Sequence, residues 1–141
     1  YLDFLTLCEF IDKKDHQYTC TPSLSHMFAM DFQLDRIMKE GIENRFIRHI
    51  EMAEYMINWA SHFFKLHVMP GFESMTVTTI ENTRNINVAE LNKELLKENM
   101  VISNGYNELK NKTFRIGHMG DLTIDDLIVL TEAMERILKL N

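Results

Sequence analysis

One short stretch near the C-terminus decides the fold, Thr113-Phe114-Arg115-Ile116-Gly117-His118-Met119-Gly120. Its first residues alternate as in a β-strand, so Phe114 and Ile116 share one face and Arg115 lies on the other. Gly117 and Gly120 leave room beside this side chain. Because a guanidinium is planar and permanently charged, Arg115 can bind a carboxylate or phosphate through two hydrogen bonds. The pattern alone also allows an ordinary surface ion pair on a strand, which is the more frequent role of an arginine at such a position.

Helical patterns dominate the region before this strand. Apolar residues recur at intervals of three and four over residues 2–14, 22–39 and 42–64, with Gly41 as the break between the last two segments. Residues 15–22 are polar and unpatterned, which predicts a loop. Thr21 can cap the second helix with Pro22 in its first turn. On the long third helix we expect Phe46, Trp59 and Phe64 to be packing residues.

The remaining patterns predict short strands separated by two helices. Alternation and turn residues indicate strands at 66–69, 75–80 and 100–103, with Asn104-Gly105 ending the third of these. Asn87 begins one helix, and Thr123 with Asp126 begins the last one. The sequence therefore predicts an α+β fold in which helices pack on a small, mostly antiparallel sheet.

Composition excludes several classes of function. The 141 residues carry a net charge of -6 and are 45% hydrophobic, which argues against non-specific binding to nucleic acid or to an anionic membrane. No apolar run approaches the roughly 18 residues that span a bilayer. Cys8 and Cys20 fit no disulfide framework, so we expect free thiols in a soluble, cytoplasmic protein. The chain opens on Tyr1 without an initiator methionine, which we interpret as the start of a fragment.

Familiar catalytic and metal-binding motifs are missing from the sequence. It contains no dinucleotide fingerprint, phosphate loop, zinc-protease helix or serine-hydrolase elbow. His16 with Cys20, or His118 with Asp121, supplies only two ligands each, so we expect no metal site. His118 is interpreted as a loop residue that shapes the glycine turn.

The run Phe-Arg-Ile-Gly-His-Met-Gly resembles the signature near the end of class V, fold-type I pyridoxal-phosphate aminotransferases, the alanine–glyoxylate and serine–pyruvate group. Further stretches follow in the order and at about the spacing of that family, namely Tyr1-Leu2-Asp3, Tyr18-Thr19-Cys20-Thr21-Pro22-Ser23, Glu40-Gly41-Ile42-Glu43-Asn44, Arg48-His49 and Met75-Thr76-Val77-Thr78. The resemblance covers nearly the whole chain. It implies the C-terminal small domain of such an enzyme, as a single domain over residues 1–141 in which 1–21 connects from a large domain.

The resemblance also implies roles for individual residues. Arg115 would bind the α-carboxylate of the substrate, and the hydroxyls of Tyr18 and Thr21 would bind the phosphate of a pyridoxal 5'-phosphate held mainly by the neighbouring subunit. Such sharing implies a homodimer. The Schiff-base lysine would lie upstream of Tyr1, so we expect no catalytic residue in this chain and no transamination by the chain alone.

Two functions from different classes remain open. The first is the C-terminal domain of a pyridoxal-phosphate aminotransferase that transfers an amino group between alanine or serine and glyoxylate or pyruvate. The second is a stand-alone, non-catalytic binding or interaction domain of the same fold. A lysine-bearing upstream half favours the first, and a natural start near Tyr1 favours the second.

Overall fold

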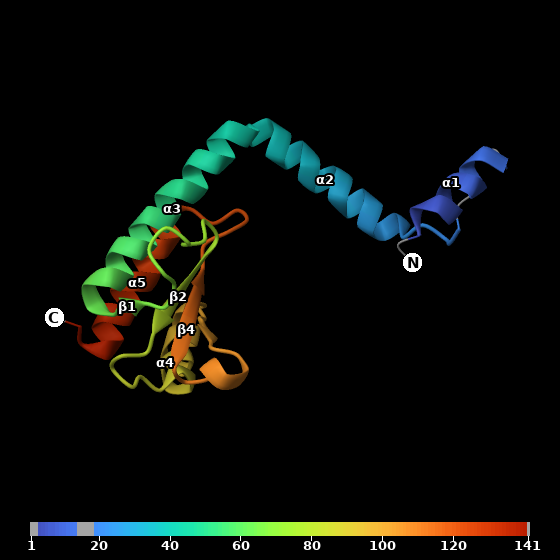
Figure 1. The fold of residues 1–141 in the computed structure, drawn as a ribbon. Coiled ribbons are helices and arrows are strands. Elements are labelled where there is room, and N and C mark those ends of the chain that lie inside the picture. The colour runs from blue at the N-terminus through green and yellow to red at the C-terminus, as the bar shows by residue number, and fades with distance from the viewer. Residues whose placement is uncertain (1–2, 14–18, 141) are drawn as a thin grey trace. The chain divides into compact units, whose positions relative to one another are not determined.

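The computed structural model describes residues 3–13 and 19–140 (Figure 1). The chain divides into two compact units, Tyr1–Gly41 and Ile42–Asn141. The first unit is helical where it is described, and the second combines helices with a sheet. Arg115 and its strand belong to the second unit.

The first unit contains α1 (Phe4–Lys13) and α2 (Leu24–Glu40). The carboxylate of Asp3 accepts hydrogen bonds from the backbone N–H groups of Leu5 and Thr6, which stabilises the first turn of α1. The predicted Thr21 cap is wrong, because Ser23 is the residue that precedes the first turn of α2. Gly41 ends α2 as predicted, with a φ of 88° that favours glycine. Neither helix contains a buried residue.

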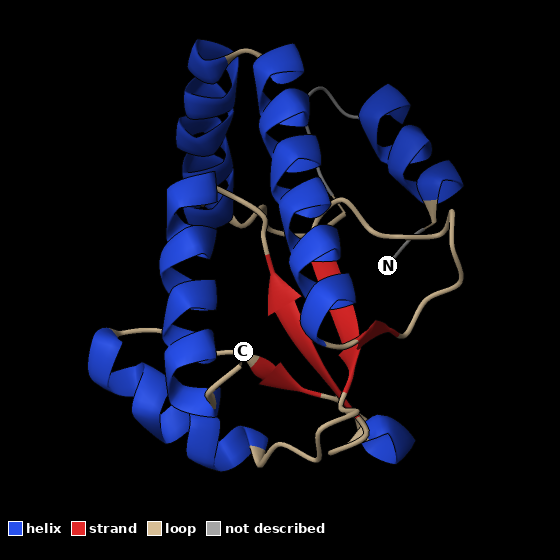
Figure 2. Cartoon of the chain, turned by 90° about the vertical axis from the view of Figure 1, so that its left-hand side faces the viewer, coloured by secondary structure: helices blue, strands red, loops and turns tan. Residues whose placement is uncertain are grey.

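The second unit is built on a four-stranded antiparallel sheet in the order β1-β2-β4-β3. Its strands are β1 (Lys65–Leu66), β2 (Val77–Glu81), β3 (Ser103–Asn104) and β4 (Thr113–Gly117). Helices α3 (Ile42–Phe63), α4 (Val88–Leu95) and α5 (Ile124–Leu138) cover one face of this sheet, and short 3₁₀ turns occupy Leu96–Glu98 and Asn107–Leu109 (Figure 2). The α+β prediction with a small antiparallel sheet is confirmed.

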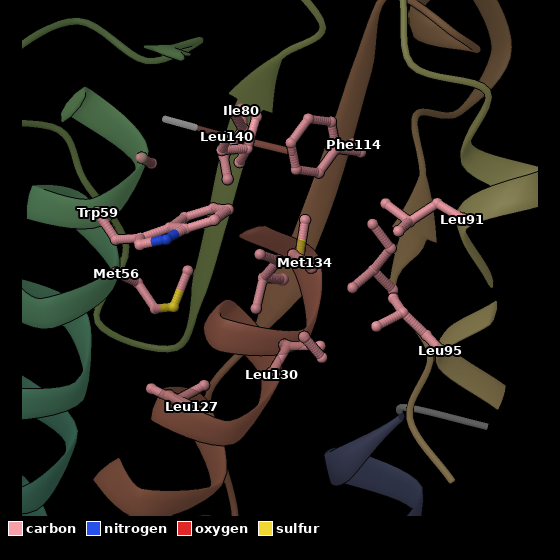
Figure 3. Close-up of a cluster of buried hydrophobic side chains, with 14 of the residues drawn as sticks. Met56, Trp59, Ile80, Leu91, Leu95, Phe114, Leu127, Leu130, Met134 and Leu140 are labelled. Atoms are coloured by element: carbon pink, nitrogen blue, oxygen red, sulfur yellow. The ribbon is translucent and has the colours of Figure 1, made fainter. Parts of the chain in front are cut away.

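The strand register sorts the side chains of β4 between the two faces as the alternation predicted. Phe114 pairs with Ile80 and Ile116 pairs with Thr78, and all four are buried beneath the helices. Figure 3 shows Phe114 and Ile80 beside Trp59 of α3 and Met134 of α5. Burial of this apolar layer supplies the main driving force for folding of the unit, at roughly 25 cal/mol per Å² of apolar area.

The three aromatic residues that were expected to pack on the third helix differ in their surroundings, and Phe64 lies one residue beyond the end of α3. Trp59 is buried in the core and donates its indole N–H to a carboxylate oxygen of Glu135 at 2.7 Å, and Phe64 packs edge-on against Phe114. The packing prediction for Phe46 is wrong, since 55% of its surface is exposed. All buried residues of α3 lie from Met52 onward, so its first turns extend outside the core.

The third strand begins later than the sequence pattern predicts. Residues 100–103 were expected, but β3 covers Ser103–Asn104. The side-chain amide of Asn92 on α4 donates to the carbonyl oxygen of Ile102 and accepts from its backbone N–H, both at 2.8 Å. Because these bonds occupy both backbone groups of Ile102, that residue is bound to α4 instead of pairing with β4.

The structure confirms the predicted N-terminal caps of α4 and α5. The side chain of Asn87 accepts hydrogen bonds from the backbone N–H groups of Ala89 and Glu90, which begins α4 as predicted. Thr123 and Asp126 form the predicted capping box of α5. These signals work because each involves residues no more than three positions apart.

Candidate functional site

The site centres on Arg115 in the middle of β4. This residue pairs with Thr79 of β2 on one side and with Ser103 of β3 on the other. Alternation along the three strands places Arg115, Thr79 and Ser103 on the face opposite the helices. Arg115 is therefore carried by β4, a central strand of the sheet, and is flanked on the neighbouring strands by two small polar residues.

Arg115 has an unusual electrostatic environment. The side chain is half-buried, and its Nε is buried without a hydrogen-bond partner. Within the described part of the chain, no carboxylate forms an ion pair with it. Its close neighbour is the Tyr106 ring, whose centroid lies 4.0 Å from the guanidinium carbon. The structure thus provides a fixed positive charge with free in-plane donors, instead of the surface ion pair that the strand pattern allowed.

The glycine loop, residues 117–122, begins at the last residue of β4 and is held by α3. Arg48 donates to the carbonyl oxygen of Leu122 at 2.5 Å and to that of Gly120 at 3.1 Å. The guanidinium of Arg45 lies 3.7 Å from the carboxylate of Asp121. Gly120 has a φ of 77°, which a residue with a side chain rarely adopts. Sequence reasoning missed both arginine roles, because they join residues more than 70 positions apart.

His118 connects the glycine loop to β2. It is fully buried, its Nε2 lies 2.9 Å from the hydroxyl oxygen of Thr78, and its backbone N–H donates to the carbonyl oxygen of Thr76. Burial lowers the pKa of His118 from its ordinary value, and the charge of His49 acts in the same direction. The residue lies in the loop as predicted, and its bonds show that it anchors the turn.

The other predicted site residues belong to the first unit. Tyr18 lies outside the described residues. Thr21 is exposed, precedes α2, and its hydroxyl makes no hydrogen bond to the described part of the chain. The role in binding a phosphate that is implied for Thr21 stays a prediction.

Metal binding, disulfide formation and membrane insertion find no support within residues 3–13 and 19–140. No group of three His, Cys, Asp or Glu side chains in these ranges could hold a metal ion. Asp121, one of the two-residue candidates, pairs with Arg45. Cys8 and Cys20 are exposed, free thiols, as predicted. None of the described helices combines the length and apolar character needed to cross a membrane.

Solved structures of aminotransferases have a fold similar to that of this chain. An alanine–glyoxylate aminotransferase from Nostoc sp. superposes with a TM-score of 0.79 at 25% identity, over 95% of this chain and 36% of that chain. No protein-family model matches the sequence. The α+β unit with its Arg115 strand is thus similar to the corresponding part of an aminotransferase.

Curated relatives agree with the structural likeness. An uncharacterized aminotransferase of Methanocaldococcus jannaschii is 31% identical over 141 residues, which cover 99% of this chain and 36% of that protein. A serine–glyoxylate aminotransferase of Arabidopsis thaliana is 29% identical over 123 residues, which cover 84% of this chain and 30% of that protein. The chain spans about a third of the length of these relatives. The chain belongs to the aminotransferase family, and its relatives include class V aminotransferases of the alanine/serine–glyoxylate group, whose C-terminal portion it matches.

Proposed function

We propose that this chain is the C-terminal domain of a pyridoxal-phosphate-dependent aminotransferase in which Arg115 binds the α-carboxylate of the substrate. The observation that carries the proposal is the half-buried guanidinium of Arg115, which has a buried, unpartnered Nε and no carboxylate partner in the described chain. A hydrogen bond between an ionised donor and a carboxylate contributes about 1.5–3 kcal/mol, and a bidentate pair adds orientation.

Small amino acids and 2-oxo acids are the proposed substrates. Relatives are named serine–glyoxylate and alanine–glyoxylate aminotransferases, which supports alanine or serine as donor and glyoxylate or pyruvate as acceptor. Donor and acceptor share a carboxylate beside the reacting carbon. One arginine that recognises this carboxylate therefore serves both halves of an amino-group exchange.

Pyridoxal 5'-phosphate is the proposed cofactor. It supplies an electron sink that stabilises the carbanion formed when the substrate loses its Cα proton. We propose that the hydroxyls of Tyr18 and Thr21 donate hydrogen bonds to the phosphate of the cofactor in a neighbouring subunit. The Schiff-base lysine is expected outside this chain, so residues 1–141 alone should not transaminate.

Domain organisation and assembly follow the same proposal. Residues 1–141 form the small domain, with 1–21 as the segment that connects it to a large domain. Helices α1 and α2 contain no buried residue and expose large apolar side chains, among them Phe28 at 72% and Phe32 at 67%. Such surfaces are typical of interfaces, which supports contact with a large domain or a second subunit in a cytoplasmic homodimer.

The test compares the full-length protein with its Arg115→Gln variant. Amino transfer from L-serine to glyoxylate or pyruvate, and from L-alanine to glyoxylate, is measured together with cofactor content by absorbance. We expect KM for both substrates to rise at least about tenfold, because a charge-assisted pair of hydrogen bonds is lost, while cofactor content is unchanged. Unchanged KM values would reject Arg115 as the carboxylate residue. A full-length protein that holds no cofactor and transfers no amino group would favour a non-catalytic binding domain.

A further inference from the structure

The connection between β3 and β4 brings an aromatic ring onto the guanidinium of Arg115. Tyr106 follows β3 by two residues, and its ring centroid lies 4.0 Å from the Arg115 Cζ. The tyrosine is nevertheless 69% exposed. A large aromatic side chain that is mostly in solvent and touches one charged group contributes little to a core. Its position therefore suggests a role in the site.

The backbone before Tyr106 is held in place by its neighbours. The side-chain oxygen of Asn104 accepts hydrogen bonds from the N–H groups of Gly105 at 2.8 Å and Asn111 at 2.9 Å. The Gly105 N–H also points to the carbonyl oxygen of Thr113, at 2.9 Å. These bonds join the two ends of the connection, so the start of the segment that presents Tyr106 is fixed relative to β4.

A ring and a carboxylate would hold an arginine in different ways. A carboxylate partner would use the in-plane N–H donors and neutralise the charge, and a substrate would have to displace it. An aromatic face attracts the cation through its quadrupole and leaves the in-plane donors free. The arrangement at Arg115 thus restricts the guanidinium without competing for the donors that an incoming carboxylate needs.

From this arrangement we propose that Tyr106 is a positioning residue, which orients the Arg115 guanidinium so that a substrate carboxylate meets it in the plane of its donors. The inference rests on the proposed role of Arg115 and adds to it the element that prepares this residue for binding. It assigns the effect to the π face of Tyr106, and not to its hydroxyl or its bulk.

Three substitutions separate these contributions in the full-length protein. Tyr106→Phe keeps the π face and removes the hydroxyl, Tyr106→Leu keeps apolar cover without a π face, and Tyr106→Ala removes both. Pyruvate binding is measured by titration calorimetry on the protein loaded with pyridoxal 5'-phosphate, which has no amino group to transfer to a 2-oxo acid, and KM and kcat for pyruvate are measured in amino transfer from L-serine. Arg115→Gln is the reference for complete loss of the carboxylate contact. Because Tyr106 is mostly exposed, all three variants should fold.

We expect Tyr106→Phe to bind pyruvate like the wild type, and Tyr106→Leu and Tyr106→Ala to bind about fivefold more weakly, the size of one partly exposed cation–π contact. KM should rise by the same factor with kcat nearly unchanged, since binding of the carboxylate is what weakens.

Other outcomes overturn the proposal in distinguishable ways. If Tyr106→Leu and Tyr106→Ala bind like the wild type while Arg115→Gln does not bind, Tyr106 has no positioning role and Arg115 keeps its own. If Tyr106→Phe loses as much affinity as Tyr106→Ala, the hydroxyl is responsible and the π-face argument is wrong. If Tyr106→Ala binds more tightly, the ring obstructs the site. If Arg115→Gln binds like the wild type, the proposed function fails together with the inference.

Discussion

Gly105 lies where the chain leaves β3, and the structure has no room there for a side chain. A Cβ on Gly105 would be pressed against the carbonyl oxygen of Leu109, with the Thr113 hydroxyl oxygen 2.5 Å away. Because Gly105 does not need a positive φ, any effect of alanine at this position comes from steric overlap and not from backbone conformation. Gly105→Ala is therefore a direct measure of how tightly this connection is packed.

The size of the effect follows from the overlap. A carbon and an oxygen in weak contact lie about 3.3–3.6 Å apart, so the Thr113 hydroxyl and the Leu109 carbonyl must each move by roughly 1 Å. Such a shift also lengthens the hydrogen bond from the Gly105 N–H to the Thr113 carbonyl. Overpacking and a weakened buried hydrogen bond together should destabilise the protein by about 2–4 kcal/mol.

The assay is thermal and urea unfolding of the wild type, of Gly105→Ala and of a matched alanine substitution at another glycine. For a unit of about 100 residues this loss lowers Tm by roughly 10–20 °C. Gly117→Ala is the control, since its Cβ would meet only the Met119 methyl group at 3.8 Å, an ordinary contact. We expect that control to lie within about 0.5 kcal/mol of the wild type. Equal Tm values for the two variants would refute the claim that the connection after β3 is tightly packed.

Three further changes test other parts of the second unit. Asn92→Ala leaves both backbone groups of buried Ile102 without partners and should lower the free energy of unfolding by about 2–4 kcal/mol; a loss under about 0.5 kcal/mol would contradict the assigned role. Arg48→Ala removes two hydrogen bonds to the glycine loop, so amide hydrogen exchange in that loop should accelerate, and unchanged exchange would count against the clamp. His118 has a lowered pKa in the folded state, so the unfolded chain binds its proton first and stability should fall as pH drops below about 6.5. A His118→Asn variant should lose this part of the pH dependence, and an equal slope in both proteins would argue against it.

Sequence reasoning worked best where the deciding interactions are local. The alternation of Phe114, Arg115 and Ile116 predicted which side chains enter the core, because a strand places successive residues on opposite faces whatever surrounds it. The capping box of α5 and the Asn87 cap were predicted for the same reason. Thr21 was assigned as a cap two residues too early, because α2 begins at Leu24 and Ser23 is the residue that precedes it.

Contacts between distant segments of the chain explain the predictions that the structure contradicts. Phe46 continues the apolar stripe of α3, yet the sheet and α5 cover only the part of that helix from Met52 onward. Ile102 has the composition of a strand residue, but Asn92 on α4 takes both of its backbone hydrogen bonds. A periodic pattern shows which face of an element is apolar. It does not show how far along the element the neighbouring layer reaches.

For the candidate site, the sequence alone determined the identity of the charge and its face. Arg115 in an alternating strand must lie opposite Phe114 and Ile116, and its guanidinium is charged in any environment. Only the tertiary structure decided that no described carboxylate neutralises it, that Tyr106 stacks on it, and that Arg48 holds the loop beyond it. The physical reason is that strand geometry acts between adjacent residues, whereas partners of a side chain are brought together by packing of distant segments.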